Sequence, residues 1–172
     1  MMLASWNVRE VNEPHKQREV RSLIRRKRLS LLGLNETRVQ STKHQAIIHS
    51  LCPSWRYFTN YSSHSNGRIW VMWDPMVLDI HLLYSSNQVI HVKAWDLQNQ
   101  INMRVSFLYG HTDYIPRREL WASLMSSSTT GPSPWIALGD FMSFGMEGKR
   151  SEATLVVLTT LRSLIYAATK LD

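Results

Sequence analysis

Four polar side chains stand where apolar runs of the sequence end: Asn7 in SWNV, Glu36 in LLGLNET, Tyr109 in SFLYGHTD and Asp140 in ALGDF. Ligands of α/β sheets collect at the carboxyl ends of the strands, so we expect these four residues to meet at one edge. Mg²⁺ prefers oxygen ligands and is commonly held by one or two carboxylates together with water and substrate phosphate. The set therefore predicts an oxygen-rich site for a divalent metal and a phosphate ester.

Each of the four residues has a chemical role that suits its type. Glu36 is the best candidate for a metal ligand, and the amide oxygen of Asn7 would lie beside it or steady it. The hydroxyl of Tyr109 can hydrogen-bond a phosphate oxygen, and Asp140 can position or deprotonate a water for in-line attack. Taken singly, Asn and Asp at strand ends are more often turn formers, and a lone tyrosine is more often a core aromatic. The occurrence of all four at strand ends favours a catalytic site over four unrelated structural residues.

A β-strand, a helix and a second strand are predicted to position the first two of these residues. The segments MLASWNV and LSLLGLNE read as buried strands, and HKQREVRSLIRRKR between them reads as a helix. Val20, Leu23 and Ile24 recur at helical spacing and predict the buried face. The opposite stripe consists of arginines: Arg18, Arg21, Arg25 and Arg28. A helix that crosses over in this way joins parallel strands.

The rest of the chain predicts a block of strands followed by a return to helix and strand alternation. TKHQAIIHSL reads as a helix, and five strands follow: RYFTNYS, GRIWVMW, VLDIHLLY, QVIHVKAWDL and INMRVSFLYG. A third helix is expected from Pro116 with Leu120, Leu124 and Met125 on one face. The strand WIALGD follows, and SEATLVVLTTLRSLIYAATKL at 151–171 is predicted to be helical. Together these elements predict one domain over residues 1–172, a layered α/β sandwich.

Composition favours a folded domain with an anionic partner. Of the 172 residues, 44% are hydrophobic and 19% are charged, which is far from the signature of disorder. The net charge of +7 and the pI of about 9.9 favour attraction to nucleic acid. No signal peptide and no apolar run long enough for a membrane span is apparent. The single cysteine, Cys52, suits a reducing compartment, and we expect an intracellular protein.

Two further features admit more than one interpretation. The basic cluster from Lys16 to Arg28 could contact a phosphate backbone, but the solvated outer face of a surface helix is the favoured interpretation. The chain has seven tryptophans. Trp70 and Trp73 stand three apart in a predicted strand, so they must face opposite sides, and at least one should lie in the core.

The ordered motifs resemble those of a known family. SWNVRE, LLGLNETRV, GRIWVMWDP, LYGHTDYIPRRELW and PWIALGDF are similar to the endonuclease/exonuclease/phosphatase superfamily, which has the fold of exonuclease III and apurinic endonucleases. Within it the chain most resembles the endonuclease domain of plant LINE-type non-LTR retrotransposons. The resemblance implies a four-layer α/β/β/α sandwich (DNase I-like) that hydrolyses phosphodiesters of DNA with Mg²⁺ or Mn²⁺. It also implies a nuclear location and a reverse-transcriptase region in the full-length ancestor.

Carried over by position, the resemblance assigns Asn7 to the metal's surroundings, Glu36 to the metal, Tyr109 to phosphate and Asp140 to the nucleophilic water. Three departures stand against it. Thr112 and Met142 occupy positions where the family has asparagine, and a thioether donates no hydrogen bond. The family's C-terminal SDH motif has no counterpart, since the last histidine is His111. We therefore expect a fold incomplete at the C-terminus.

These departures lead to two hypotheses about activity. The first is a metal-dependent DNA endonuclease domain of retrotransposon descent that is impaired or inactive, because groups that act as a unit in catalysis fail together. The alternative is a non-catalytic basic remnant that binds nucleic acid, or a pseudogene product.

Overall fold

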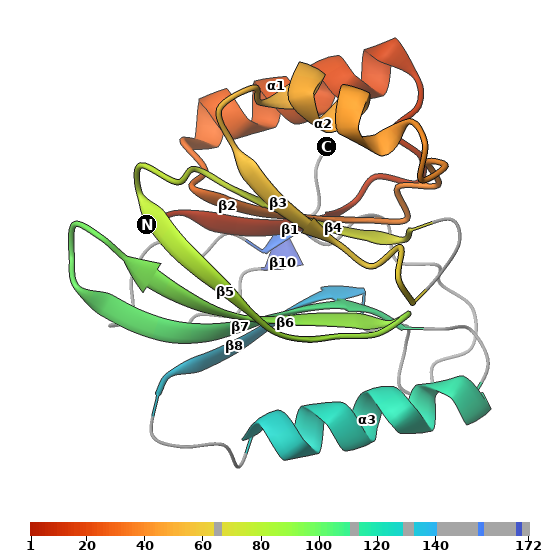
Figure 1. Ribbon diagram of the computed structural model, residues 1–172, viewed down its shortest axis with the longest axis vertical. Helices are drawn as coiled ribbons and strands as arrows, with labels where there is room; N and C mark the ends of the chain where they lie inside the picture. Colours follow the sequence, from red (N-terminus) through yellow and green to blue (C-terminus); the bar gives the residue numbers. More distant parts are fainter. Residues whose placement is uncertain (64–66, 111–113, 129–132, 141–154, 157–167, 170–172) are drawn as a thin grey trace.

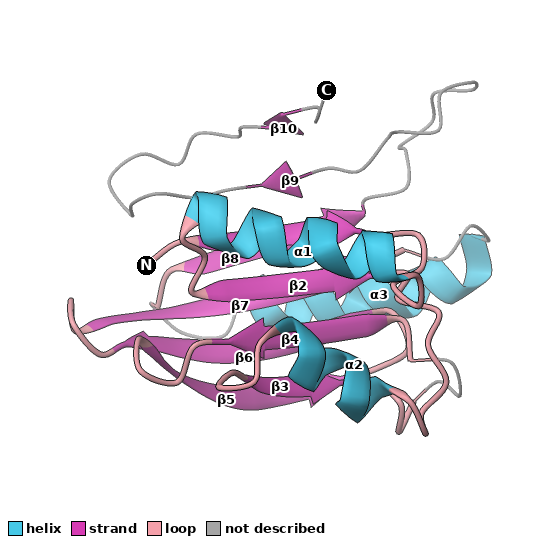
Figure 2. Cartoon of the chain, turned by 90° about the horizontal axis from the view of Figure 1, so that it is seen from above, coloured by secondary structure: helices cyan, strands magenta, loops and turns pink. Residues whose placement is uncertain are grey.

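A computed structural model describes residues 1–63, 67–110, 114–128, 133–140, 155–156 and 168–169. Two four-stranded sheets pack face to face, with α1 (Pro14–Lys27) and α2 (His44–Leu51) over the first sheet and α3 (Tyr114–Ser128) over the second (Figure 1). Seen from above, the two helical layers lie on opposite sides of the strands (Figure 2). The predicted α/β/β/α sandwich is confirmed.

The first sheet has the strand order β1-β2-β4-β3, and its strands are β1 (Leu3–Asn7), β2 (Leu31–Asn35), β4 (Ile69–Trp73) and β3 (Arg56–Thr59). The predicted parallel pairing of β1 with β2 is confirmed, and β4 runs antiparallel to both of its neighbours. Pro14 opens α1 at the first helical position, which suits its missing N–H. The helix then buries Val20, Leu23 and Ile24 against the sheet, as the spacing predicts.

The second sheet has the order β5-β6-β7-β8, with the strands β5 (Leu78–Ser85), β6 (Val89–Asp96), β7 (Ile101–Tyr109) and β8 (Trp135–Asp140). Strands β5 to β7 form an antiparallel meander, and β8 joins β7 in parallel after the crossover through α3. The second sheet therefore ends with a parallel pair, like the β1–β2 pair of the first sheet.

Trp70 and Trp73 show how a strand's alternation builds two cores. Trp70 is fully buried among residues of α1 and α2, and Trp73 is buried between the two sheets. The prediction that they face opposite sides is confirmed. Between the sheets, Gly33 lies against the ring of Phe107, where an added Cβ would overlap ring carbons. This close approach brings β2 next to β7.

Two predictions about helices are corrected. Leu120 and Leu124 of α3 are buried, but Met125 on the same helix is 70% exposed, because α3 turns a narrower apolar face toward Val89 and Leu108 than predicted. Helix α3 also begins at Tyr114, two residues before Pro116.

The helix predicted over 151–171 is wrong where that segment is described. Leu155–Val156 and Ala168–Thr169 form two short antiparallel strands, β9 and β10. The β-branched side chains of Val156 and Thr169 suit an extended backbone better than a helix. The remaining residues of the predicted helix lie outside the described part of the chain.

Candidate active site

The strand registers bring the four predicted residues to two neighbouring strand ends. Asn7 ends β1 opposite Asn35, and Glu36 follows directly after β2. Tyr109 ends β7 opposite Asp140, the last residue of β8. Each sheet therefore carries two of the four residues at the carboxyl end of a parallel pair, which is where the rule for α/β sheets places ligands.

Asn35 ties the two strand ends into one edge. This asparagine is buried, and its Nδ2 donates hydrogen bonds to the Leu108 carbonyl at 2.9 Å and to the Ser5 hydroxyl at 3.3 Å. Leu108 directly precedes Tyr109, so one side chain joins the end of β2 to the end of β7. Sequence reasoning did not single out Asn35, although a polar residue inside the apolar run LLGLNE was a usable signal.

The segments that follow β1 and β2 are paired and strained. The amide N–H groups of Val8, Glu10 and Val11 donate to the carbonyls of Asn35, Glu36 and Thr37 at 3.0, 2.8 and 3.1 Å. Four non-glycine residues of these segments have left-handed backbone conformations: Arg9, Glu10, Glu36 and Arg38. Such a conformation costs about 1–2 kcal/mol per residue and persists where the surroundings impose it, most often at functional sites. Backbone pairing holds Glu36 in this conformation.

The side chains of Glu36 and Asn7 are only partly exposed at this edge. Glu36 is 18% exposed and lies 3.5 Å from the guanidinium of Arg38, which is itself 62% exposed. The side-chain oxygen of Asn7 accepts a hydrogen bond from the Arg9 amide at 3.2 Å.

Arg68 brings a cation to the same edge. Because β4 runs antiparallel to β2 and pairs Ile69 with Asn35, the residue before β4 lies next to the end of β2. The guanidinium carbon of Arg68 sits 5.3 Å from the ring centre of Tyr109 in a cation–π contact. Sequence reasoning missed Arg68, because only the antiparallel return of β4 carries it to the strand ends.

The backbone on both sides of Arg68 is anchored. The Thr37 hydroxyl donates to the Gly67 carbonyl at 2.6 Å, and the Ile69 amide donates to the side-chain oxygen of Asn60 at 2.9 Å. Thr37 and Asn60 are both fully buried. Arg68 therefore leaves a fixed backbone rather than a free loop.

Some predicted features lie beyond what can be described. Thr112 and Met142 lie outside the described residues, and Asp140 is placed by its backbone register with Tyr109 alone.

The described oxygen donors suit a magnesium-type ion. Among the described residues no group of three or more His, Cys, Asp and Glu side chains is arranged to hold a metal. A carboxylate from Glu36 together with an amide oxygen from Asn7, carried by adjacent strand ends, is nevertheless a type of donor set that Mg²⁺ accepts, since this ion usually completes its shell with water and substrate phosphate. A zinc-type cluster would need more nitrogen or sulfur ligands. In the described part of the chain, no helix combines the length and apolarity that crossing a membrane requires.

Comparison with known proteins places this architecture in a family. A sequence profile described as the Endonuclease/Exonuclease/phosphatase family matches residues 4–141. No curated protein matches the sequence.

Solved structures match the fold at low sequence identity. The endonuclease domain of TRAS1, a telomere-specific non-LTR retrotransposon, superposes with a TM-score of 0.62 at 12% identity, covering 81% of this chain and 59% of that one. TDP2 from D. rerio, complexed with a single-strand DNA product, gives 0.59 at 11% identity, covering 81% and 58%. The human Nocturnin catalytic domain gives 0.55 at 15% identity, covering 83% and 65%. The chain thus spans less than two thirds of the length of each of these structures.

Proposed function

Because the chain belongs to the endonuclease/exonuclease/phosphatase family, whose members are typically metal-dependent hydrolases, we propose that it is a phosphodiester hydrolase domain that acts on DNA. We assign its origin to a non-LTR retrotransposon of the plant LINE type, joined in the full-length ancestor to a reverse transcriptase and acting on genomic DNA in the nucleus. The fold match to the TRAS1 endonuclease domain supports a retrotransposon origin, and the sequence motifs alone support the plant type.

One observation supports the proposal above all: strand ends from two different sheets, each carrying two of the predicted site residues, lie at one edge. Asn7 and Glu36 end the β1–β2 pair, Tyr109 and Asp140 end the β7–β8 pair, and the buried Asn35 amide joins the two pairs. Their convergence beside an arginine suits an anionic phosphate ester.

Each residue has a distinct task in this proposal. The Glu36 carboxylate and the Asn7 amide oxygen would hold Mg²⁺ or Mn²⁺, which, when bound, supplies positive charge to a phosphate oxygen. The Tyr109 hydroxyl donates a hydrogen bond to another phosphate oxygen, and Arg68 supplies a second positive charge nearby. Asp140 takes a proton from the water that attacks phosphorus in line with the departing oxygen.

We further propose that turnover is impaired. At position 142 the family motif has an asparagine that can donate a hydrogen bond, and this chain has methionine. Removing one preorganised donor from such a site typically costs roughly 10²–10³ in rate. This replacement also favours the second candidate, a basic domain that binds nucleic acid without cleaving it.

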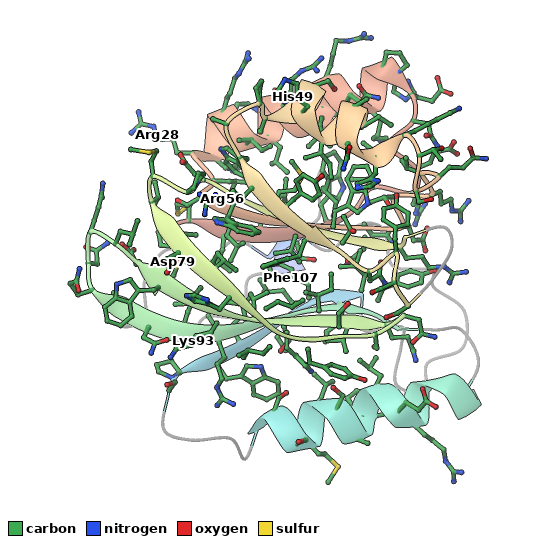
Figure 3. All side chains as sticks on the ribbon, viewed as in Figure 1. Arg28, His49, Arg56, Asp79, Lys93 and Phe107 are labelled. Carbon is green, nitrogen blue, oxygen red and sulfur yellow. The ribbon has the colours of Figure 1, made fainter. Side chains whose placement is uncertain are left out.

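Nicking of supercoiled plasmid separates the two candidates. The purified chain with Mg²⁺ should convert supercoiled plasmid slowly to open circles, and chelation should stop the conversion. Glu36→Gln should abolish nicking because it keeps the shape of the side chain and removes its charge. Asp79→Asn is the matched control, since Asp79 is an exposed carboxylate on β5 and should leave nicking unchanged (Figure 3).

The proposal fails if nicking persists in Glu36→Gln or in the presence of chelator, because a contaminating nuclease or a different site would then be responsible. DNA that is bound and retarded in a gel, yet never cut at any protein concentration, would establish the non-catalytic candidate.

A further inference from the structure

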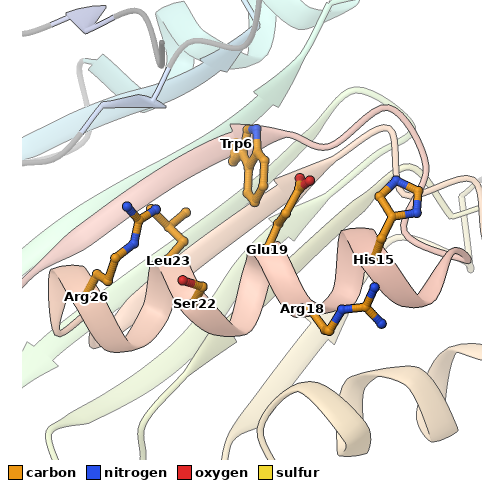
Figure 4. Close-up of a pocket in the computed structure, with 7 residues that line it drawn as sticks. All are labelled: Trp6, His15, Arg18, Glu19, Ser22, Leu23 and Arg26. Carbon is orange, nitrogen blue, oxygen red and sulfur yellow. The ribbon is translucent and has the colours of Figure 1, made fainter.

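Helix α1 carries a concave, arginine-lined surface that the proposed hydrolysis does not use. Arg18, Arg21, Ser22, Arg25 and Arg26 line a hollow of about 470 Å³ on the outer side of the helix. A second hollow, of about 740 Å³, shares Arg18, Ser22 and Arg26 with it and reaches Trp6 on β1 (Figure 4). We call the two hollows together the α1 groove.

We propose that the α1 groove binds the phosphate backbone of a nucleic acid, as a second contact surface beside the strand-end edge. The binding does not require cleavage, so the proposal goes beyond the hydrolase function and stands independently of it.

Within the described residues, most of the positive charge of α1 has no acidic partner. The helix has six cationic residues and one carboxylate, Glu19, and this carboxylate already pairs with Lys16 at 2.7 Å. Among the described residues, no carboxylate forms an ion pair with Arg18, Arg25 or Arg26, all of which are exposed. Cations without acidic partners concentrate positive potential and attract an anion.

Helix stability does not explain this charge distribution. Cations stabilise the C-terminal turn of a helix and acids the N-terminal turn. Arg25 and Arg26 fit that rule, but Arg18 lies in the N-terminal half and the first turn contains no acidic residue. The basic face therefore extends past the turn where the helix dipole would favour it.

One wall of the groove is fixed in place. The guanidinium of Arg21 donates to the Ser50 carbonyl of α2 at 3.1 Å, which holds this arginine against the neighbouring helix. An arginine already ordered by the fold loses less freedom when it meets a ligand.

The length and position of the groove favour a nucleic acid over a compact anion. Arg26 stands eight positions after Arg18, which is about 12 Å along the helix axis. Along the axis of a duplex, where each strand carries one phosphate per roughly 3.4 Å of rise, this length corresponds to about three to four phosphates of one strand. Trp6 lies in the groove and directly precedes Asn7 of the strand-end edge. A backbone bound at that edge can therefore continue along α1.

Salt-dependent binding tests the proposal. We would measure the fluorescence anisotropy of labelled 20-nucleotide single- and double-stranded DNA with the full chain, in EDTA, over a salt series. Arg25→Ala/Arg26→Ala should weaken binding by roughly tenfold and lower the slope of log K against log salt by about 2. Arg25→Lys/Arg26→Lys should keep most of the affinity, because the charge is kept.

A control of equal charge separates a local groove from general attraction. Arg56→Ala/Lys93→Ala removes two exposed cations from β3 and β6 and should leave the affinity and the slope nearly unchanged (Figure 3). Equal losses in the two double variants would overturn the proposal, since net charge alone would then explain binding. Binding of α1 to vesicles containing phosphatidylserine, with no binding to nucleic acid, would also overturn it.

The Glu36→Gln variant keeps the two proposals apart. It should lose nicking and retain groove-dependent binding of DNA. If the hydrolase proposal fails, the binding measurement still tests the α1 groove. If the groove proposal fails, plasmid nicking still tests the hydrolase.

Discussion

We predict that the free energy of unfolding of this domain falls in mild acid because of the buried imidazole of His91. His91 lies on β6 beneath α3 and is 5% exposed, and its ring nitrogens hydrogen-bond the hydroxyls of Ser106 at 2.6 Å and Ser123 at 2.8 Å. Burial, assisted by the nearby positive charge of Arg104, lowers the pKa of His91 from 6.5 to about 4. The folded protein therefore holds this ring neutral well into the acid range.

The consequence for stability follows from proton binding to the two states. Below pH 6.5 the unfolded chain takes up a proton at His91 that the folded chain refuses, so the free energy of unfolding falls as the pH falls, down to about pH 4. The difference between the two pKa values corresponds to a decrease of about 2 kcal/mol in the free energy of unfolding between pH 7 and pH 5.

Urea denaturation at pH 7, 6 and 5 measures this loss. His91→Gln should lose little over the same interval, because its amide can both donate and accept hydrogen bonds and does not titrate. Asp96 does not interfere: burial acts to raise its pKa, but hydrogen bonds from Asn99 and Gln98 and the N-terminal charge together hold it below 3.8. The stability that the Asp96 carboxylate contributes is therefore lost only at pH values below this range. The same pH dependence in wild type and His91→Gln would refute the assignment.

Three further predictions concern packing and the strand-end edge. Gly33→Ala should lower the free energy of unfolding by about 1–3 kcal/mol in urea denaturation, because the added Cβ would overlap the ring of Phe107. Adding Phe107→Leu to the same chain should recover part of this stability. Purely additive effects of the two substitutions would contradict the packing explanation. Arg68→Ala should weaken DNA binding in EDTA by roughly tenfold. Arg68→Lys should keep only part of the affinity, because lysine retains the charge but not the planar stacking on Tyr109. Wild-type affinity in Arg68→Lys would argue against a role for stacking. Met142→Asn should raise the plasmid-nicking rate by up to about 10²–10³-fold, and an unchanged rate would mean that Met142 does not limit turnover.

Much of the fold follows from local patterns. The helical spacing of Val20, Leu23 and Ile24 predicted the buried face of α1, and the apolar runs on either side predicted a parallel pair. The opposite orientations of Trp70 and Trp73 followed from the two-residue period of a strand. These features are readable because each depends on neighbours in the sequence.

The failures share a cause. The sequence predicts Met125 on one face of α3 with Leu120 and Leu124, and it predicts a helix over 151–171. Those two leucines are buried, but Met125 is exposed and Leu155–Val156 is a strand. Periodicity states which residues can share a face, but packing partners decide how wide the buried face is. Whether a β-branched segment pairs with another strand likewise depends on residues far away in the chain.

The sequence by itself determined which residues could do chemistry and that strand ends would present them. Only the tertiary structure decided which strand ends meet. The buried Asn35 amide joins β2 to β7 across 73 positions of the chain, and the antiparallel return of β4 carries Arg68 to Tyr109. A contact between residues so far apart depends on how two sheets stack, and the stacking depends on side-chain shape, such as the fit of Phe107 against Gly33, which no local pattern encodes.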